Sequence, residues 1–222
     1  KSLSDRINDA KCSILVTADG SFRGEKIIPL KEITDQATKI TPSIKKCVVV
    51  KRVQNKINFN DKKDVWWHKE MENVSKDCNA RSMEAEDTLF ILYTSGSTGK
   101  PKGIQHSIAG YMVYAEYSFR NVFQYKQNDI YWCTADIGWI TGHSYIVYGP
   151  LLSGATTIMF EGVPSHPSYS RFWEIIEKYK VTIFYTAPTA IRTLEAQGDE
   201  CVNPYNLSSL RVLGTVGEPI NY

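Results

Sequence analysis

Residues 88–103 read TLFILYTSGSTGKPKG, an apolar run followed directly by a loop of small, hydroxyl-bearing and basic residues. The apolar run, residues 88–94, combines β-branched and aromatic side chains and predicts a strand. The next segment places three glycines, four hydroxyl side chains and two lysines within ten residues. We therefore expect a strand that leads into a loop able to bind phosphate.

The chemistry of this loop suits phosphate in three ways. Glycine lets the main chain adopt shapes closed to other residues and approach a ligand closely. Successive backbone N–H groups can form an anion-binding nest, to which hydroxyl donors and lysine charges add. A flexible surface loop is the alternative, but it does not require this combination of residues. The candidate phosphate-binding residues are Thr94, Ser95, Gly96, Ser97, Thr98, Gly99, Lys100 and Lys102.

The loop is not the P-loop of common nucleotide triphosphatases. The pattern GxxxxGK[ST] would require glycine where Thr94 stands and a serine or threonine where Pro101 stands. An ordinary P-loop ATPase is thereby excluded, and the phosphates must be bound by a different motif.

The sequence on the amino-terminal side of the loop predicts a strand–helix–strand unit. Residues 12–18 and 47–50 are short apolar runs, and apolar residues between them recur at helical spacing, at Leu30, Ile33, Ala37 and Ile40. This order predicts a βαβ unit and a parallel sheet. Residues 45–63 contain seven lysines and arginines, and we interpret them mostly as a solvated connection.

The same alternation continues after the loop. Strands are expected at residues 130–134, 156–160, 181–185 and 210–216. Two helices are expected from apolar faces formed by Ile108, Tyr111, Met112, Ala115, Phe119 and Val122, and by Phe172, Ile175, Ile176 and Tyr179. The predicted fold class is α/β, with layered, mostly parallel sheets flanked by helices.

Composition narrows the class of protein. The 222 residues are 42% hydrophobic and 23% charged, with a net charge of +2, so no basic surplus points to nucleic acid or to a membrane surface. Five scattered cysteines without a CxxC pair indicate free thiols in a reducing compartment, and no zinc-type spacing occurs. A cytoplasmic location is the default expectation, although a chain that opens on Lys1 could lack a targeting signal.

The loop and several separated segments resemble one family. The sequence YTSGSTGKPKG (residues 93–103) is similar to the phosphate-binding signature of the adenylate-forming enzymes. Within that superfamily, further segments resemble AMP-forming acetyl-coenzyme A synthetases, and the similarity covers nearly the whole chain from about residue 14. These segments are TADGSFRGEKIIPLK (17–31), TADIGWITGHSYIVYGPL (134–151), FYTAPTAIRTL (184–194) and LGTVGEPIN (213–221).

The resemblance implies a two-step reaction. Acetate attacks the α-phosphate of Mg-ATP to give acetyl-adenylate and pyrophosphate, and the thiol of coenzyme A then displaces AMP. The implied substrates are acetate, ATP with Mg²⁺, and coenzyme A, with no nucleic-acid or membrane partner and no metal-ligating residues in this chain. The oligomeric state stays open.

The resemblance also implies positions for the other ligands. The adenine would lie against Gly217, Glu218 and Pro219, and the acyl group would be enclosed by Trp139, Ile140, Thr141 and Val216. Coenzyme A would contact Arg23, Gly24, Glu25, Lys26, Thr141, Ser165 and Ala187. Ser165 departs from the family, which usually has asparagine there, and is the shorter side chain. Without the resemblance, Trp139 is read as a buried core residue.

The implied domain organisation is a partial N-terminal adenylation domain over residues 1–222. Residues 1–85 form a βαβ-containing segment on the coenzyme A side, and residues 86–222 carry the phosphate loop and the acyl pocket. The mobile C-terminal domain, with its catalytic lysine, is absent from this sequence. We therefore expect no catalytic residue within the fragment and no ATP–pyrophosphate exchange by the fragment alone.

Two other functions stay open. The first is a ligase for propionate or another short acid, since one methylene in a pocket discriminates by only about 10- to 200-fold. The second is a non-catalytic module that retains the fold.

Overall fold

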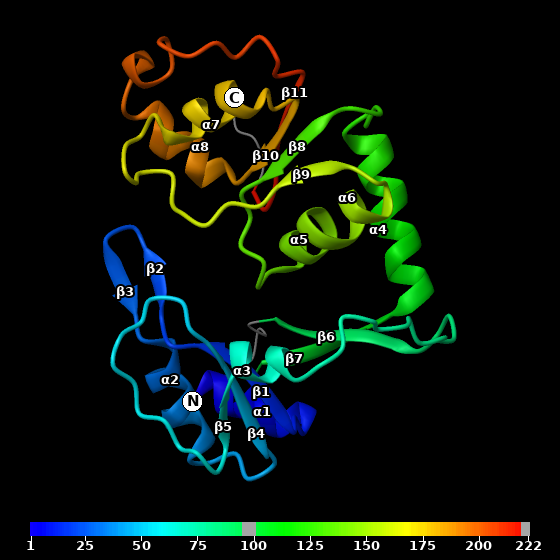
Figure 1. Cartoon of the computed structure of the whole chain (residues 1–222). Coiled ribbons are helices and arrows are strands. Elements are labelled where there is room, and N and C mark those ends of the chain that lie inside the picture. Colours follow the sequence, from blue (N-terminus) through cyan, green and yellow to red (C-terminus); the bar gives the residue numbers. More distant parts are fainter. Residues whose placement is uncertain (95–100, 219–222) are drawn as a thin grey trace. The chain divides into compact units, whose positions relative to one another are not determined.

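The computed structural model describes residues 1–94 and 101–218, which form two compact units. Unit 1 comprises Lys1–Glu84 and Thr88–His106, and unit 2 comprises Ala85–Asp87 and Ser107–Tyr222 (Figure 1). The strand that precedes the phosphate loop thus belongs with the amino-terminal part of the chain. The functional division at residue 85 stays a prediction, and six of the eight predicted phosphate-loop residues, together with Pro219, lie outside the described residues.

Among its described residues, unit 1 contains a three-stranded parallel sheet. Its order is β1 (Ile14–Ala18), β4 (Lys46–Val50) and β5 (Asp64–Trp66), with Leu15 opposite Cys47 and Cys47 opposite Asp64. Helix α2 (Leu30–Thr38) lies in the chain between β1 and β4, which confirms the predicted βαβ unit. The interpretation of residues 45–63 as mostly a solvated connection is only partly correct. Residues 46–50 instead form β4, whereas residues 51–63 contain no helix or strand and are mostly exposed.

Further elements of unit 1 were not predicted. These are the strand β5, the helices α1 (Ser2–Ala10) and α3 (Trp67–Glu72), the antiparallel hairpin of β2 (Ser21–Arg23) and β3 (Lys26–Ile28), and β7 (Lys102–Ser107). Strand β7 pairs with β6 (Thr88–Thr94), which is the predicted strand before the phosphate loop. The phosphate loop therefore joins two paired strands.

The predicted apolar face of α2 is only partly correct, because Ala37 is buried as expected but Ile33 and Ile40 are not. The buried residues are Lys31, Thr34 and Ala37, whereas Ile33 and Ile40 are exposed and Ile40 lies beyond the helix end. A lysine can occupy the buried face because its Nζ lies 2.5 Å from Asp35 Oδ1 and 2.9 Å from Asp64 Oδ2. Burial alone would lower the pKa of Lys31, but the bonds to these two carboxylates outweigh it and raise the pKa. Paired charges are the condition under which lysine is tolerated inside a protein.

Unit 2 is built on a four-stranded parallel sheet. Its order is β11 (Val212–Thr215), β10 (Ile183–Thr186), β8 (Ile130–Cys133) and β9 (Thr156–Ile158), so all four strands predicted in this region are present. The helices are α4 (Ile108–Val122), α5 (Ile140–Gly142), α6 (Gly149–Leu152), α7 (Arg171–Tyr179) and α8 (Pro188–Glu195), with a π-helix η1 (His143–Tyr148) and a 3-10 helix η2 (Asp199–Cys201) (Figure 1).

Helices cover both faces of this sheet, and alternate residues of β8 and β10 enter different cores. Trp132 and Phe184 pack with Phe172 and Ile176 of α7. Residues of the opposite parity, such as Tyr131, pack with aromatic residues of α4 and of the segment that follows it. Burial on both faces is typical of parallel sheets in α/β proteins, and it confirms the predicted class.

Three expectations of burial in unit 2 are wrong. Val122 is 68% exposed and Tyr179 is 47% exposed, and each is the last residue of its helix. Trp139 is 65% exposed and is therefore no core residue. Within the described ranges, no helix combines the length and the apolar character needed to span a membrane.

Candidate functional site

The predicted ligand-binding residues of unit 2 follow the carboxyl ends of its parallel strands. Trp139, Ile140 and Thr141 come after β8, and Ser165 comes after β9. Ala187 directly follows β10, and Val216 to Glu218 directly follow β11. Because the strands are parallel, their carboxyl ends share one edge of the sheet. Ligands of open α/β sheets bind at this edge.

The order of the strands marks one position on this edge. The chain passes from β8 to β9 on one side of β8, and then to β10 on the other side. The reversal places a topological switch point between β8 and β10, the position where such sheets bind ligands. The hydroxyls of Thr134 and Thr186 meet there at 2.5 Å, and Thr134 N–H donates to the Tyr185 carbonyl at 3.0 Å. These bonds hold the start of the 134–141 segment against the end of β10.

The turn that carries Trp139 is closed by its own hydrogen bonds. Asp136 Oδ1 accepts from Gly138 N–H at 2.7 Å, and the Asp136 carbonyl accepts from Trp139 N–H at 3.1 Å. The Trp139 carbonyl accepts from His143 N–H at 3.1 Å and lies 3.0 Å from His143 Nδ1. The exposed Trp139 ring is thus presented by a well-defined turn.

Gly142 allows this turn to pack against the helix that follows. A Cβ at Gly142 would lie 2.5 Å from the Asp136 carbonyl oxygen and 2.6 Å from Ile137 Cα. Both are backbone atoms, so any side chain at Gly142 would displace the turn. Helix α5 continues into the π-helix η1, where the buried Ser144 hydroxyl lies 2.6 Å from the hydroxyl of Tyr111 in α4. Wide π-helical turns are frequent at functional sites.

The predicted adenine segment begins with a glycine that its backbone requires. Gly217 has φ = 97°, a conformation that favours glycine. Val216 N–H donates to the Thr186 carbonyl at 3.1 Å, which continues the pairing of β10 and β11 beyond the strand ends. Glu218 is held by Arg192 of α8 at 2.8 Å. The turn is therefore attached both to the sheet and to α8.

In unit 1, the two strands around the phosphate loop approach each other closely. A Cβ at Gly103 would lie 3.0 Å from Tyr93 Cζ and 3.0 Å from Ile91 Cγ2, so the ring of Tyr93 packs against the glycine backbone. Tyr93 OH donates to Asp9 Oδ2 of α1 at 2.5 Å. This hydrogen bond, together with burial, raises the pKa of Tyr93 to about 12. Thr94 and Lys102, the described members of the predicted phosphate site, are both exposed.

The predicted coenzyme A segment is the tip of the β2–β3 hairpin. Arg23 ends β2, Lys26 begins β3, and the two residues pair across the strands. Gly24 and Glu25 form the connecting turn, in which Gly24 has φ = 60°. Arg23, Glu25 and Lys26 are exposed, so the tip presents two cations to solvent.

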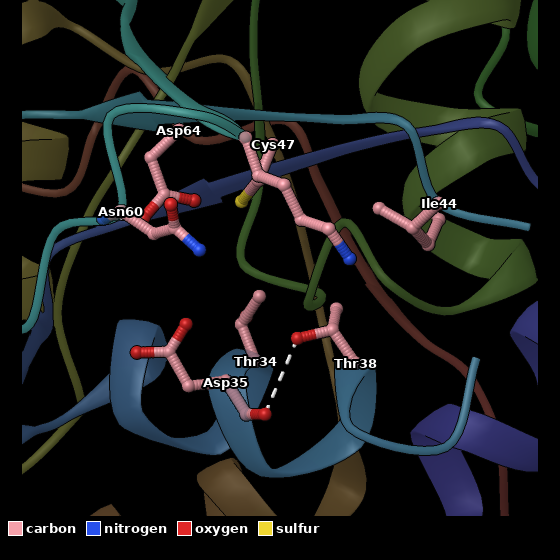
Figure 2. A pocket seen from close by; sticks show the side chains of 8 residues that line it. Thr34, Asp35, Thr38, Ile44, Cys47, Asn60 and Asp64 are labelled. Atoms are coloured by element: carbon pink, nitrogen blue, oxygen red, sulfur yellow. Dashed lines mark hydrogen bonds between the residues drawn. The ribbon is translucent and has the colours of Figure 1, made fainter. Parts of the chain in front are cut away.

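A small pocket in unit 1 contains none of the predicted site residues. Figure 2 shows Thr34, Asp35 and Thr38 of α2 on one side and Cys47 and Asp64 on the other. Burial, together with the charge of Asp64, raises the pKa of the Cys47 thiol to about 11, so the thiol is not ionised at neutral pH. We interpret the pocket as a packing feature around the buried Lys31 ion pairs.

Sequence reasoning missed two side chains that organise the predicted sites. Asp9 was not singled out, and nothing in the sequence connects it with Tyr93, which is 84 residues away. Asp19 is buried, and its carboxylate accepts several backbone hydrogen bonds. An aspartate followed by glycine directly after an apolar strand is a turn signal, and it could have drawn attention to Asp19.

Comparisons with known proteins identify the family. The family model of the AMP-binding enzymes matches residues 1–222. The acetyl-coenzyme A synthetase of gamma-proteobacterium EBAC31A08 is 58% identical over 221 residues, and acetyl-coenzyme A synthetase 2 of Pseudomonas aeruginosa is 56% identical over 220 residues. The acetyl-coenzyme A synthetase of Bdellovibrio bacteriovorus is 54% identical over 220 residues. These alignments cover 99% or more of this chain and 34% of each relative.

The chain therefore spans about a third of the length of the curated relatives it matches. The family match extends from its first residue to its last, and the chain belongs to the family of AMP-binding enzymes.

Proposed function

We propose that the protein containing this chain is an AMP-forming acetate–CoA ligase. The observation that carries the proposal is an identity of 54–58% to acetyl-coenzyme A synthetases over essentially the whole chain. The aligned length spans the phosphate-loop signature and the segments at the carboxyl edge of the sheet in unit 2.

The proposed chemistry has two displacement steps. A carboxylate oxygen of acetate attacks the α-phosphorus of ATP, the bond to the bridging β-oxygen breaks, and pyrophosphate leaves. The thiol of coenzyme A then attacks the acyl carbon, loses its proton, and AMP leaves with its phosphate oxygen. Both steps depend on positioning and on neutralising charge.

Each group of residues has a role in this proposal. Thr94 and Lys102, with the loop residues between them, hold the phosphates that leave as pyrophosphate. The Gly217–Glu218 turn forms a wall for adenine, because the glycine permits close approach. Mg²⁺ would enter with the phosphates, since this ion keeps several waters and binds through substrate phosphates. Among the described residues, no group of three or more His, Cys, Asp or Glu side chains is arranged to hold a metal.

The acyl pocket and the coenzyme A contacts complete the assignment. Trp139, Ile140, Thr141 and Val216 would enclose the acetate methyl group, with the Thr141 hydroxyl at the polar end. Arg23 and Lys26 suit the phosphates of coenzyme A, because arginine offers a forked donor and lysine a point charge. Thr141, Ser165 and Ala187, with the hairpin residues Gly24 and Glu25, would border the remainder of that substrate.

The test is a substrate comparison on the full-length protein. We expect acetate-dependent ATP–pyrophosphate exchange without coenzyme A, and AMP with acetyl-CoA when coenzyme A is added. A higher kcat/KM for propionate than for acetate would favour the propionate ligase. Tight binding of ATP and coenzyme A with no exchange on any short acid would favour a non-catalytic module.

A further inference from the structure

The hairpin that carries Arg23 and Lys26 is attached to unit 1 through one buried carboxylate. Asp19 lies one residue after β1 and is 1% exposed. Its Oδ1 accepts from the backbone N–H groups of Gly20, Arg52 and Val53 at 2.8, 2.8 and 3.0 Å. Its Oδ2 accepts from Gln54 N–H at 2.8 Å. One side chain thus binds the start of the hairpin and the connection after β4.

The backbone of Asp19 is used as well. Its N–H donates to the Val50 carbonyl at 2.9 Å, and its carbonyl accepts from Lys31 N–H at 3.3 Å. Lys31 lies just beyond the hairpin, so Asp19 contacts the chain at both ends of the hairpin. A carboxylate with four N–H donors is strongly held, because hydrogen bonds to a charged group are stronger than neutral ones.

Close packing at Gly20 supports the same attachment. A Cβ at Gly20 would lie 2.7 Å from Val53 Cγ2 and 3.0 Å from the Ile28 carbonyl oxygen. The connection 52–54 and strand β3 therefore both lie against this glycine. Gln54 takes φ = 60°, which is uncommon for a residue with a side chain, and its N–H is bound to Asp19.

A second contact joins the connection to the hairpin. The guanidinium of Arg52 lies over the ring of Phe22, 4.9 Å from its centroid. Phe22 is in β2, directly before Arg23. The Arg52 backbone is held by Asp19 while its side chain covers Phe22, so the position of β2 depends on Asp19 through two routes.

We propose that Asp19 is a positioning residue for the coenzyme A step. It holds the hairpin so that Arg23 and Lys26 can receive the phosphate-bearing end of coenzyme A, and it does not touch that substrate itself. This inference rests on the proposed ligase function and adds a residue to it. Adenylation should not depend on the hairpin, because acetate and ATP are assigned to other segments.

The two half-reactions of the full-length enzyme separate these roles. Asp19→Asn keeps the size of the side chain but turns an N–H donor toward the donors that Asp19 binds. We expect a 10- to 100-fold rise in KM for coenzyme A, since a misplacement of about 1 Å can cost about 100-fold. The KM values for ATP and acetate in ATP–pyrophosphate exchange should stay within about twofold of the wild type.

The matched control is Asp64→Asn in the same unit. Asp64 is also buried, at 6% exposure, and its Oδ2 accepts from Lys31 Nζ at 2.9 Å and from Asn60 N–H at 2.8 Å. If Asp19 acts only on the stability of unit 1, the two variants should change both half-reactions alike. If it positions the hairpin, only Asp19→Asn should raise the KM for coenzyme A.

A milder variant guards against a failure to fold. Phe22 is 42% exposed, so Phe22→Leu preserves an apolar side chain and removes only the contact with the Arg52 cation. We expect a two- to fivefold rise in KM for coenzyme A, as for an exposed cation–π pair (about 0.5–1 kcal/mol).

Three outcomes would overturn the inference. The first is an unchanged KM for coenzyme A in both Asp19→Asn and Phe22→Leu. The others are an equal loss of activity in the two half-reactions of Asp19→Asn, or an equal rise in the KM for coenzyme A in Asp64→Asn. Absence of acetate-dependent exchange in the wild type would instead contradict the proposed function.

Discussion

Val216→Ala tests whether the residue directly after β11 forms part of the acyl pocket. Val216 is half-buried, its N–H is bound to the Thr186 carbonyl, and its side chain packs at the aromatic cluster around Tyr185. The substitution removes two methyl groups and leaves the backbone bond in place. If Val216 borders the acetate methyl group, the vacated space admits the extra methylene of propionate.

The expected size follows from the burial of one methylene. Burial of a CH₂ group contributes about 0.8 kcal/mol, which corresponds to a factor of about four in kcat/KM. The ratio of kcat/KM for propionate to that for acetate should therefore rise at least about fourfold. Loss of contacts to acetate would increase the change further, up to the limit of about 200-fold that one methylene can provide.

The assay measures kcat/KM for both acids in ATP–pyrophosphate exchange by the full-length protein. The control is Val212→Ala, which removes the same two methyl groups at the start of the same strand, where Val212 packs against the same aromatic cluster. An unchanged ratio in Val216→Ala would refute the pocket assignment. An equal change in Val212→Ala would show that the effect comes from loosened packing instead.

Three further predictions concern single contacts. Tyr93→Phe removes the hydrogen bond to Asp9 and should raise the KM for ATP about three- to tenfold. An unchanged KM for ATP would contradict a role of Tyr93 in holding the strands beside the phosphate loop. Gly142→Ala should lower stability by about 1–3 kcal/mol because of the clash with residues 136–137, whereas the exposed Gly110→Ala in α4 should not lower the melting temperature. Burial alone would raise the pKa of Asp19, but its backbone N–H donors lower that pKa. The stabilising effect of the Asp19 carboxylate should therefore be present above pH 5 and be lost as the pH falls below the usual aspartate value of about 3.9. Urea denaturation curves of the wild type and of Asp19→Asn should then converge at low pH.

Periodicity predicted most of the sheet strands, because burial on both faces of a parallel sheet produces continuous apolar runs. Residues 130–134, 181–185 and 210–216 are examples, each overlapping an observed strand. Short, exposed elements escaped the same reasoning. The β2–β3 hairpin and β7 carry few buried residues, so their sequences hold no strong apolar pattern.

The helical face of α2 shows where periodicity fails. Apolar spacing favoured Ile33 and Ile40, yet Lys31 and Thr34 are buried. The deciding partner is Asp64, on a strand 33 residues away from Lys31. A local sequence pattern does not show that Lys31 pairs with a carboxylate on a distant strand. Hydrophobicity alone therefore assigns Lys31 to the surface.

For the candidate site, residue types and their spacing predicted one kind of binding chemistry, a loop suited to phosphate. The assignment of the turn after β11 to adenine and of the 139–141 segment to the acyl group came only from the resemblance to the adenylate-forming enzymes, and both stay predictions. The tertiary structure decided which of these residues share an edge of the sheet in unit 2, and that Trp139 is exposed rather than in the core. It also decided that one carboxylate, Asp19, holds residues 20 and 52–54 together. The physical reason is that hydrogen bonds and close packing join positions distant in the chain, and only the folded backbone brings those positions within reach.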